Sequence, residues 1–136
     1  MSHFGPAVSY ETANDPLFRM RAYRLAAGLV EVAWQDAKTL SAERVTERIS
    51  GQLYAAVASI SANIGEGYSR SSGKDRARIF EFALGSIRES ISWYRAARPT
   101  LGEIVETRLN TLEELRRLLL AIIPRERGQP LPRTKR

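Results

Sequence analysis

The chain has 136 residues, of which 43% are hydrophobic, so it can form one domain with a core. It has no cysteine, which excludes disulfides, thiolate chemistry and cysteine-bound zinc. The net charge is +6, and all but three of the 21 basic residues are arginine, a side chain suited to phosphate contacts and interfacial ion pairs.

The first sixteen residues are polar and end at Pro16. They contain no basic start followed by an apolar run, so they are not a signal peptide. No apolar stretch in the chain approaches the ~20 residues that a membrane span needs. We therefore expect a cytoplasmic protein without a membrane partner, in which residues 1–16 form a loose N-terminal segment.

The first predicted helix covers residues 17–38. Its apolar residues fall on one stripe at helical spacing, which we expect to face the core: Met20, Tyr23, Ala27, Val30, Trp34 and Ala37. A second apolar edge lies outside that stripe: Leu25, Leu29 and Val32. A monomer would expose this edge, and such a patch predicts self-association.

The second predicted helix begins after a cap at Ser41 and reaches Tyr68. Its apolar stripe is formed by Leu53, Val57, Ile60 and Ile64. Small side chains occupy several faces of its middle: Ala55, Ala56, Ala58, Ser59, Ser61 and Ala62. Because small side chains let neighbouring backbones approach closely, we expect this helix to be the most enclosed of the four.

The third helix is predicted to start at Ser72, a capping residue followed by Asp75 in the first turn. Its core stripe is Phe80, Ala83, Leu84, Ile87, Ile91 and Tyr94, and outside the stripe lie Ile79, Phe82 and Trp93. Gly85 and Ser86 sit in mid-helix. We expect Gly85 at a close contact with the second helix, where leucine would cost about 1–3 kcal/mol through overpacking.

Pro99 and Gly102 end the third helix, and the fourth covers residues 103–123 up to Pro124. Its stripe is Val105, Leu109, Leu112, Leu115, Leu119 and Ile122. Residues 124–136 form a basic, proline-containing tail that we expect to be flexible. The domain, residues 17–123, is thus predicted to be an all-α, antiparallel, up-down-up-down four-helix bundle.

Catalytic chemistry has few candidates in this sequence. The only histidine is His3, so neither an inward-facing Glu-x-x-His metal site nor an ordinary Ser-His-Asp arrangement can be built. We expect no enzyme activity, no metal and no cofactor.

One polar motif stands out near the end of the second helix. Asn63 and Glu66 share a helix face, Ser59 lies one turn earlier, and Gly67 follows. These side chains either fix the helix register through hydrogen bonds or form a site for a ligand or partner. The first reading predicts that Glu66→Gln is milder than Glu66→Ala.

Two groups of basic residues are the candidate binding site. Arg19, Arg21 and Arg24 lie at the start of the first helix, and Arg70, Lys74, Arg76 and Arg78 surround the turn between the second and third helices. In an antiparallel bundle these two places share one end. The seven charges therefore form either a phosphate-binding patch for nucleic acid or an ordinary solvated rim.

A family resemblance comes from residues 52–89. Their pattern resembles the four-helix bundle proteins encoded in intervening sequences of bacterial 23S rRNA genes: Gln52-Leu53, Ser59-Ile60, Asn63-Ile64, Glu66-Gly67, a Ser/Arg/Lys turn, and Ala83-Leu84-Gly85-Ser86. The resemblance implies a ring-like pentamer without enzyme activity. It also implies kinship to the accessory variability protein of diversity-generating retroelements, which binds nucleic acid and a reverse transcriptase.

These observations lead to one functional prediction and one rival. The prediction is a non-enzymatic, self-assembling basic bundle that binds RNA, DNA or a nucleic-acid-handling protein such as a reverse transcriptase. The rival is a protein-protein interaction scaffold whose arginines form salt bridges between subunits and have no nucleic-acid role.

Overall fold

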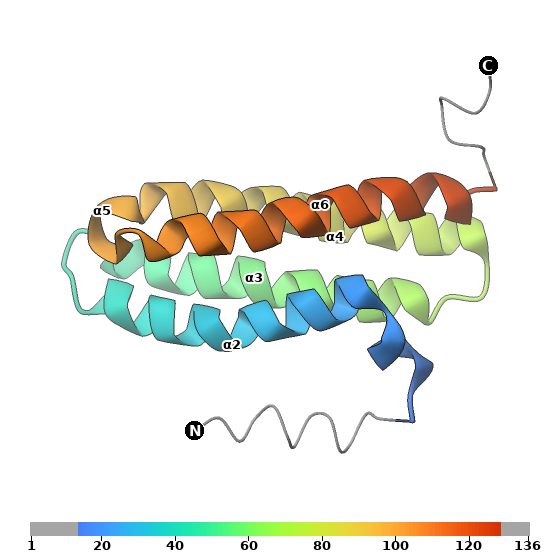
Figure 1. Ribbon diagram of the computed structural model, residues 1–136, viewed down its shortest axis with the longest axis horizontal. Coiled ribbons are helices and arrows are strands. Elements are labelled where there is room, and N and C mark those ends of the chain that lie inside the picture. The colour runs from blue at the N-terminus through green and yellow to red at the C-terminus, as the bar shows by residue number, and fades with distance from the viewer. Residues whose placement is uncertain (1–13, 129–136) are drawn as a thin grey trace.

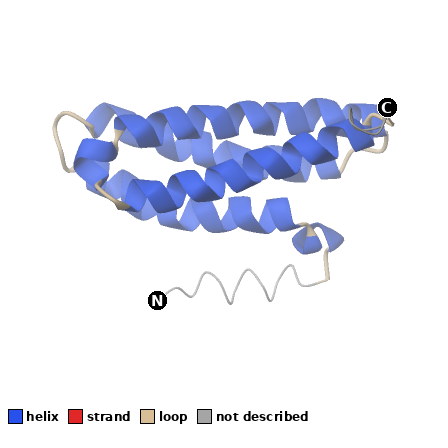
Figure 2. Cartoon of the chain, turned by 45° about the horizontal axis from the view of Figure 1, so that its top comes forward, coloured by secondary structure: helices blue, strands red, loops and turns tan. Residues whose placement is uncertain are grey.

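The structure is a computed structural model that describes residues 14–128. These residues fold into helices and loops without strands (Figure 2). The elements are a short 3-10 helix η1 (Pro16–Arg19) and the helices α2 (Arg21–Ser41), α3 (Glu47–Tyr68), α4 (Gly73–Ala96), α5 (Arg98–Leu101) and α6 (Ile104–Glu126). Nearly all of the predicted N-terminal segment and most of the predicted tail lie outside the described residues.

The four long helices form an antiparallel bundle, as the sequence predicted (Figure 1). Helix α3 packs between α2 and α4, and α4 packs between α3 and α6. The seam between α2 and α6 is the least closely packed of the four. One end of the bundle holds the start of α2, the α3–α4 link and the end of α6, and the other end holds the α2–α3 loop and α5 (Figure 1).

The core runs along the middle of this bundle and takes side chains from all four long helices. Leu40, Leu53, Phe80 and Leu115 are among its largest fully buried residues. The predicted stripe of α3 is confirmed, because Leu53, Val57, Ile60 and Ile64 are all completely buried. The predicted stripes of α4 and α6 are also buried, apart from Ile91, Leu109 and Ile122, which are half-buried at the margin of the core.

The first long helix starts later than predicted. The Asp15 carboxylate accepts a hydrogen bond from the Leu17 backbone N–H at 3.0 Å, and Pro16 follows at the first position of η1. Met20 then adopts an extended backbone with ψ 119°, which separates η1 from α2. Residues 16–19 are therefore a separate turn, and α2 begins at Arg21 and extends to Ser41 rather than to Lys38.

The predicted core stripe of this helix was wrong. The buried apolar residues are Ala22, Ala26, Leu29, Ala33 and Leu40, whereas Trp34 of the predicted stripe is 52% exposed. Leu29, predicted as an outer edge, is core, while its neighbours Leu25 and Val32 are half-buried beside α6. Because α2 carries apolar residues on both sides of its core face, the helical spacing of apolar residues predicted the face next to the one that is buried.

Helix α3 also begins later than predicted, because Ser41 ends α2 rather than capping α3. Its hydroxyl donates to the Lys38 carbonyl at 3.0 Å. The loop that follows is held by buried Thr46, whose hydroxyl donates to the Leu40 carbonyl at 2.8 Å. The expectation that α3 is the most enclosed of the four helices was wrong as well, since Ala55 and Ala62 are exposed and α4 contains more buried residues.

Helix α4 starts where the sequence predicted. The Ser72 hydroxyl accepts a hydrogen bond from the Asp75 backbone N–H at 3.1 Å, the geometry of an N-cap.

The expected role of Gly85 was wrong: it is exposed, and a Cβ built there would meet no atom within 4 Å. Gly67 is instead the glycine at the close α3–α4 contact, because a Cβ there would lie 2.8 Å from the Phe80 ring.

The last helix ends later than predicted. Pro99 is the second residue of the short helix α5, and Gly102, with φ 71°, ends that helix. Helix α6 then passes through Pro124 and ends at Glu126. Pro124 removes one backbone donor from the last turn, and the helix continues past it, with the Arg127 N–H bonded to the Ile123 carbonyl at 3.2 Å.

Candidate nucleic-acid interface

The two predicted basic groups lie on elements that meet at one end of the bundle, which we term the basic end (Figure 1). The residues of the first group are on η1 and the start of α2: Arg19, Arg21 and Arg24. The residues of the second group are on the α3–α4 link and the first turns of α4: Arg70, Lys74, Arg76 and Arg78. The antiparallel topology thus brings together the ends on which both groups sit.

Four of these seven side chains are paired with carboxylates. Arg21 contacts Glu114 of α6 at 2.5 Å, and Arg76 contacts Glu126, also of α6, at 2.7 Å. The remaining two pair within the turn itself: Arg70 with Glu66 at 2.6 Å and with Asp75 at 3.7 Å, and Arg78 with Asp75 at 3.3 Å. More than half of the positive charges in the predicted patch are therefore neutralised by a carboxylate. Two of these carboxylates, Glu114 and Glu126, lie far from their arginines in the sequence.

The other three cations remain available. Arg19, Arg24 and Lys74 are exposed and have no carboxylate within 4 Å among the described residues, although Arg24 also donates to the Phe18 carbonyl at 3.2 Å. Arg125, in the last turn of α6, is exposed and equally without such a partner. We term these four residues the open cations. They come from η1, α2, α4 and α6.

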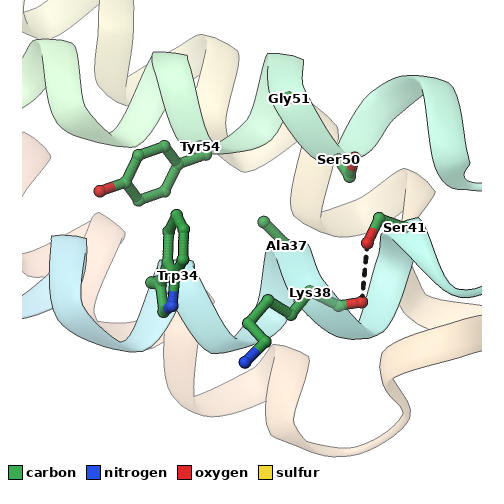
Figure 3. Close-up of a pocket in the computed structure, with 7 residues that line it drawn as sticks. All are labelled: Trp34, Ala37, Lys38, Ser41, Ser50, Gly51 and Tyr54. Atoms are coloured by element: carbon green, nitrogen blue, oxygen red, sulfur yellow. Dashed lines mark hydrogen bonds between the residues drawn. The ribbon is translucent and has the colours of Figure 1, made fainter.

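A second surface feature lies on the outer side of the α2–α3 pair. An apolar groove of about 240 Å³ is lined by Trp34, Ala37, Lys38, Ser41, Ser50, Gly51 and Tyr54. Figure 3 shows Trp34 pointing from α2 toward Tyr54 of α3, while Lys38 points away from α3. The two rings meet edge to face with their centroids 5.5 Å apart. The groove is thus an exposed aromatic surface away from the basic end.

Comparison with known proteins identifies the family. The model of the 23S rRNA-intervening sequence protein family matches residues 19–123, which span all four long helices. The chain belongs to this family. The resemblance seen in residues 52–89 is thereby confirmed. No curated protein matches the chain.

A crystal structure resembles this member of the 23S rRNA-intervening sequence family along most of its length. It is that of a protein of unknown function from the S23 ribosomal protein family of Bacteroides thetaiotaomicron. The identity is 25%, the TM-score is 0.69, and the alignment covers 75% of this chain and 97% of the other. The four-helix bundle is therefore shared with a solved structure.

The six residues of the polar motif of this family member are spread over α3 and α4 and differ in burial. Glu66 is exposed and accepts the Arg70 hydrogen bond at 2.6 Å, whereas Asn63 is half-buried. The Ser59 hydroxyl donates to the carbonyl of Ala55, one turn back, at 2.9 Å. Ser86 is half-buried and Gly85 exposed on α4, so only Gly67 of the six motif residues is buried. The motif is not a single enclosed site.

A buried polar cluster was missed by sequence reasoning. Tyr94 of α4 donates to the Asp36 carboxylate of α2 at 2.6 Å, and Arg108 of α6 forks onto the same carboxylate at 2.7 and 3.1 Å. Burial, with the hydrogen bond to Asp36, raises the pKa of Tyr94, and the bond to Asp36 raises the pKa of Arg108. The available signal was Asp36 itself, which interrupts the buried stripe between Ala33 and Leu40.

Residues 14–128 contain no group of three or more histidine, cysteine, aspartate or glutamate side chains placed to hold a metal ion. Among the same residues, no helix is both long and apolar enough to pass through a lipid bilayer.

Proposed function

We propose that the chain is a non-enzymatic, self-assembling helical bundle that binds RNA or DNA at its basic end. The observation that carries this proposal is the set of open cations, Arg19, Arg24, Lys74 and Arg125. Four different elements bring them to one end, and residues 14–128 contain no carboxylate partner for any of them. Arginine and lysine in such a set contact backbone phosphates and read little sequence.

The ion pairs lower the expected salt dependence of binding. Seven uncompensated charges would give a steep dependence, whereas four phosphate contacts on a single strand give a slope of log affinity against log salt of about −3 per bound subunit. Arg70 and Arg76 are already held by Glu66 and Glu126, so replacing them would also release acids. The open cations are the residues to change.

A triple variant tests the proposal: Arg19→Gln, Arg24→Gln and Lys74→Gln. We expect weaker binding to single-stranded oligonucleotides of any sequence and a slope flattened to about −1, because only the Arg125 contact remains in this set. Fluorescence anisotropy between 50 and 200 mM salt measures both. The fold should be retained, since exposed charges contribute little to stability.

The matched control removes three exposed arginines elsewhere: Arg44→Gln, Arg48→Gln and Arg88→Gln. It lowers the net charge equally but leaves the basic end intact, so its slope should stay near that of the unmodified chain. Equal effects of the two triple variants, or no effect of either, would contradict binding through the basic end.

The rival function, a protein-protein interaction scaffold, is favoured by a different observation. Arg21, Arg70, Arg76 and Arg78 are all engaged by carboxylates of the same chain, so they are not free to bind phosphate, and the open cations are then the basic side chains that could pair with acids of another subunit. If the open-cation variant binds oligonucleotides unchanged, this function replaces the first.

Self-assembly is the second part of the proposal, and exposed large apolar side chains support it. Trp34 on α2 and Phe82 on α4 are each 52% exposed, and Leu120 on α6 is 41% exposed. We take the partner in the α2–α3 groove to be a second copy that presents a different apolar face, such as the one around Phe82. Such a heterologous contact repeats around a ring, and the family resemblance makes a pentamer the expected size.

Light scattering tests the assembly. The chain mass is 15.3 kDa, and at micromolar concentration we expect a multiple of this value. Trp34→Ser and Phe82→Ser should each lower the measured mass because they remove apolar area from the contact. Val45→Ser is the control, since Val45 is 90% exposed but lies in the α2–α3 loop. A wild-type mass of about one chain would refute self-association.

A further inference from the structure

A pocket of about 510 Å³ opens at the basic end. Its lining comes from the η1–α2 junction, the end of α3, the start of α4 and the end of α6: Met20, Tyr68, Arg76, Phe80, Ile122, Arg125 and Glu126. The volume lies in the range of about 300–1,000 Å³ that is usual for small-molecule sites. None of the residues Tyr68, Ile122 or Met20 belongs to the predicted basic patch.

The uncharged part of the lining suits a flat apolar group. Met20 and Ile122 are half-buried and supply an apolar wall, and Tyr68, the last residue of α3, is 39% exposed. The Phe80 ring is fixed in place, because it packs against the α3 backbone at Gly67 with no room for a Cβ. A planar ring can therefore rest against the half-buried Met20 and Ile122 and stack on Tyr68.

The charged part of the lining suits one negative charge. Arg76 donates to Glu126 at 2.7 Å and to the Arg70 carbonyl at 2.9 Å, so its charge is compensated and its position is fixed. Arg125 has no carboxylate within 4 Å among the residues that the structure describes. The pocket therefore holds one uncompensated cation beside an aromatic and apolar wall.

We infer that this pocket binds one unpaired nucleotide, with its base against Tyr68 and its phosphate on Arg125. The inference rests on the proposed function, because the remaining open cations would hold the phosphates of the adjoining strand. It adds a preference for unpaired over duplex nucleic acid, which phosphate contacts alone do not give. A base in a duplex is stacked and paired, and would have to be flipped out at a cost before it could enter.

Three ligands test this inference: a single-stranded thymidine 12-mer, the same backbone with abasic sites throughout, and thymidine 5′-monophosphate. We expect the abasic strand to bind about tenfold more weakly than the thymidine strand, the effect of losing one base–aromatic stack. Tyr68→Ala should weaken the thymidine strand by a similar factor and leave the abasic strand unchanged. Tyr68→Phe, which keeps the ring, should behave like the unmodified protein.

Thymidine 5′-monophosphate tests whether the pocket binds a free nucleotide or only a nucleotide within a strand. NMR titration at millimolar concentration should shift Tyr68 resonances, and Arg125→Gln should weaken this binding while Arg44→Gln at the far end should not. If thymidine monophosphate binds and neither strand does, the pocket assignment stands and the proposed function falls. If the two strands bind equally with a normal salt slope and the mononucleotide causes no shift, the proposed function stands and the pocket assignment is overturned. Absence of binding by all three ligands overturns both.

Discussion

Replacing Asp36 by alanine should lower the free energy of unfolding by about 3–5 kcal/mol, the usual cost of removing one partner from a buried ion pair. Asp36 is 5% exposed and accepts hydrogen bonds from Tyr94 and Arg108. Its removal leaves a buried phenol and a largely buried guanidinium without their acceptor. The loss then contains the desolvation of both groups as well as the lost attraction.

Urea denaturation at one fixed protein concentration measures this effect, because assembly makes stability depend on concentration. Asp36→Asn should be milder, since the amide still offers an acceptor to one of the two donors. Glu113→Ala is the control: Glu113 pairs with Arg116 on the surface of α6 and should contribute little. A loss for Asp36→Ala no larger than that for Glu113→Ala would show that the buried cluster does not stabilise the bundle.

The same substitution at two helical glycines should have opposite effects. Gly67→Ala should destabilise the chain by about 1–3 kcal/mol, because the new Cβ would lie 2.8 Å from two atoms of the Phe80 ring and 3.3 Å from the Ile79 Cβ. All three groups are buried between α3 and α4, so relief requires the helices to separate or the ring to leave its rotamer.

Gly85→Ala is the matched control. Gly85 lies inside α4 with open space around it, and alanine there should stabilise by about 0.5–1 kcal/mol because it restricts the unfolded chain and favours the helix. Thermal or urea unfolding of both variants gives the comparison. Destabilisation by Gly85→Ala, or tolerance of Gly67→Ala, would mean that the α3–α4 packing differs from that described.

The sequence predicts features that depend on neighbouring residues better than features that depend on contacts between distant helices. The start of α4 was predictable because Ser72 and Asp75 form their cap within one turn. The core face of α2 was not, because Leu29 and Val30 are equally apolar neighbours and only packing against α3 and α6 selects Leu29. Helical periodicity identifies a face only where the opposite flank is polar.

The candidate site also combines features that the sequence predicts with long-range contacts that it does not predict. Sequence reasoning placed the elements that carry the basic residues at the same end, because an antiparallel bundle returns α3 to the end where α2 began, but Arg19 lies on η1 rather than on the first long helix. It could not show that Glu114 and Glu126 of α6 would reach Arg21 and Arg76, since these pairs are 93 and 50 residues apart in the chain. A local charge count therefore overestimates the free charge of the patch.

The weakly packed α2–α6 seam has a consequence for motion. Two ion pairs link the helices across this seam. Near the C-terminal end of α2, Asp36 pairs with Arg108, and both side chains are shielded from solvent. At the N-terminal end of α2, Arg21 pairs with Glu114, and both side chains are partly solvated. Between them lies a groove of about 280 Å³. Salt screens the solvated pair far more than the shielded one. We therefore expect local opening of the bundle to start at the first turn of α2, beside the open cations, so that a rise in ionic strength that weakens phosphate contacts also weakens the packing beneath them.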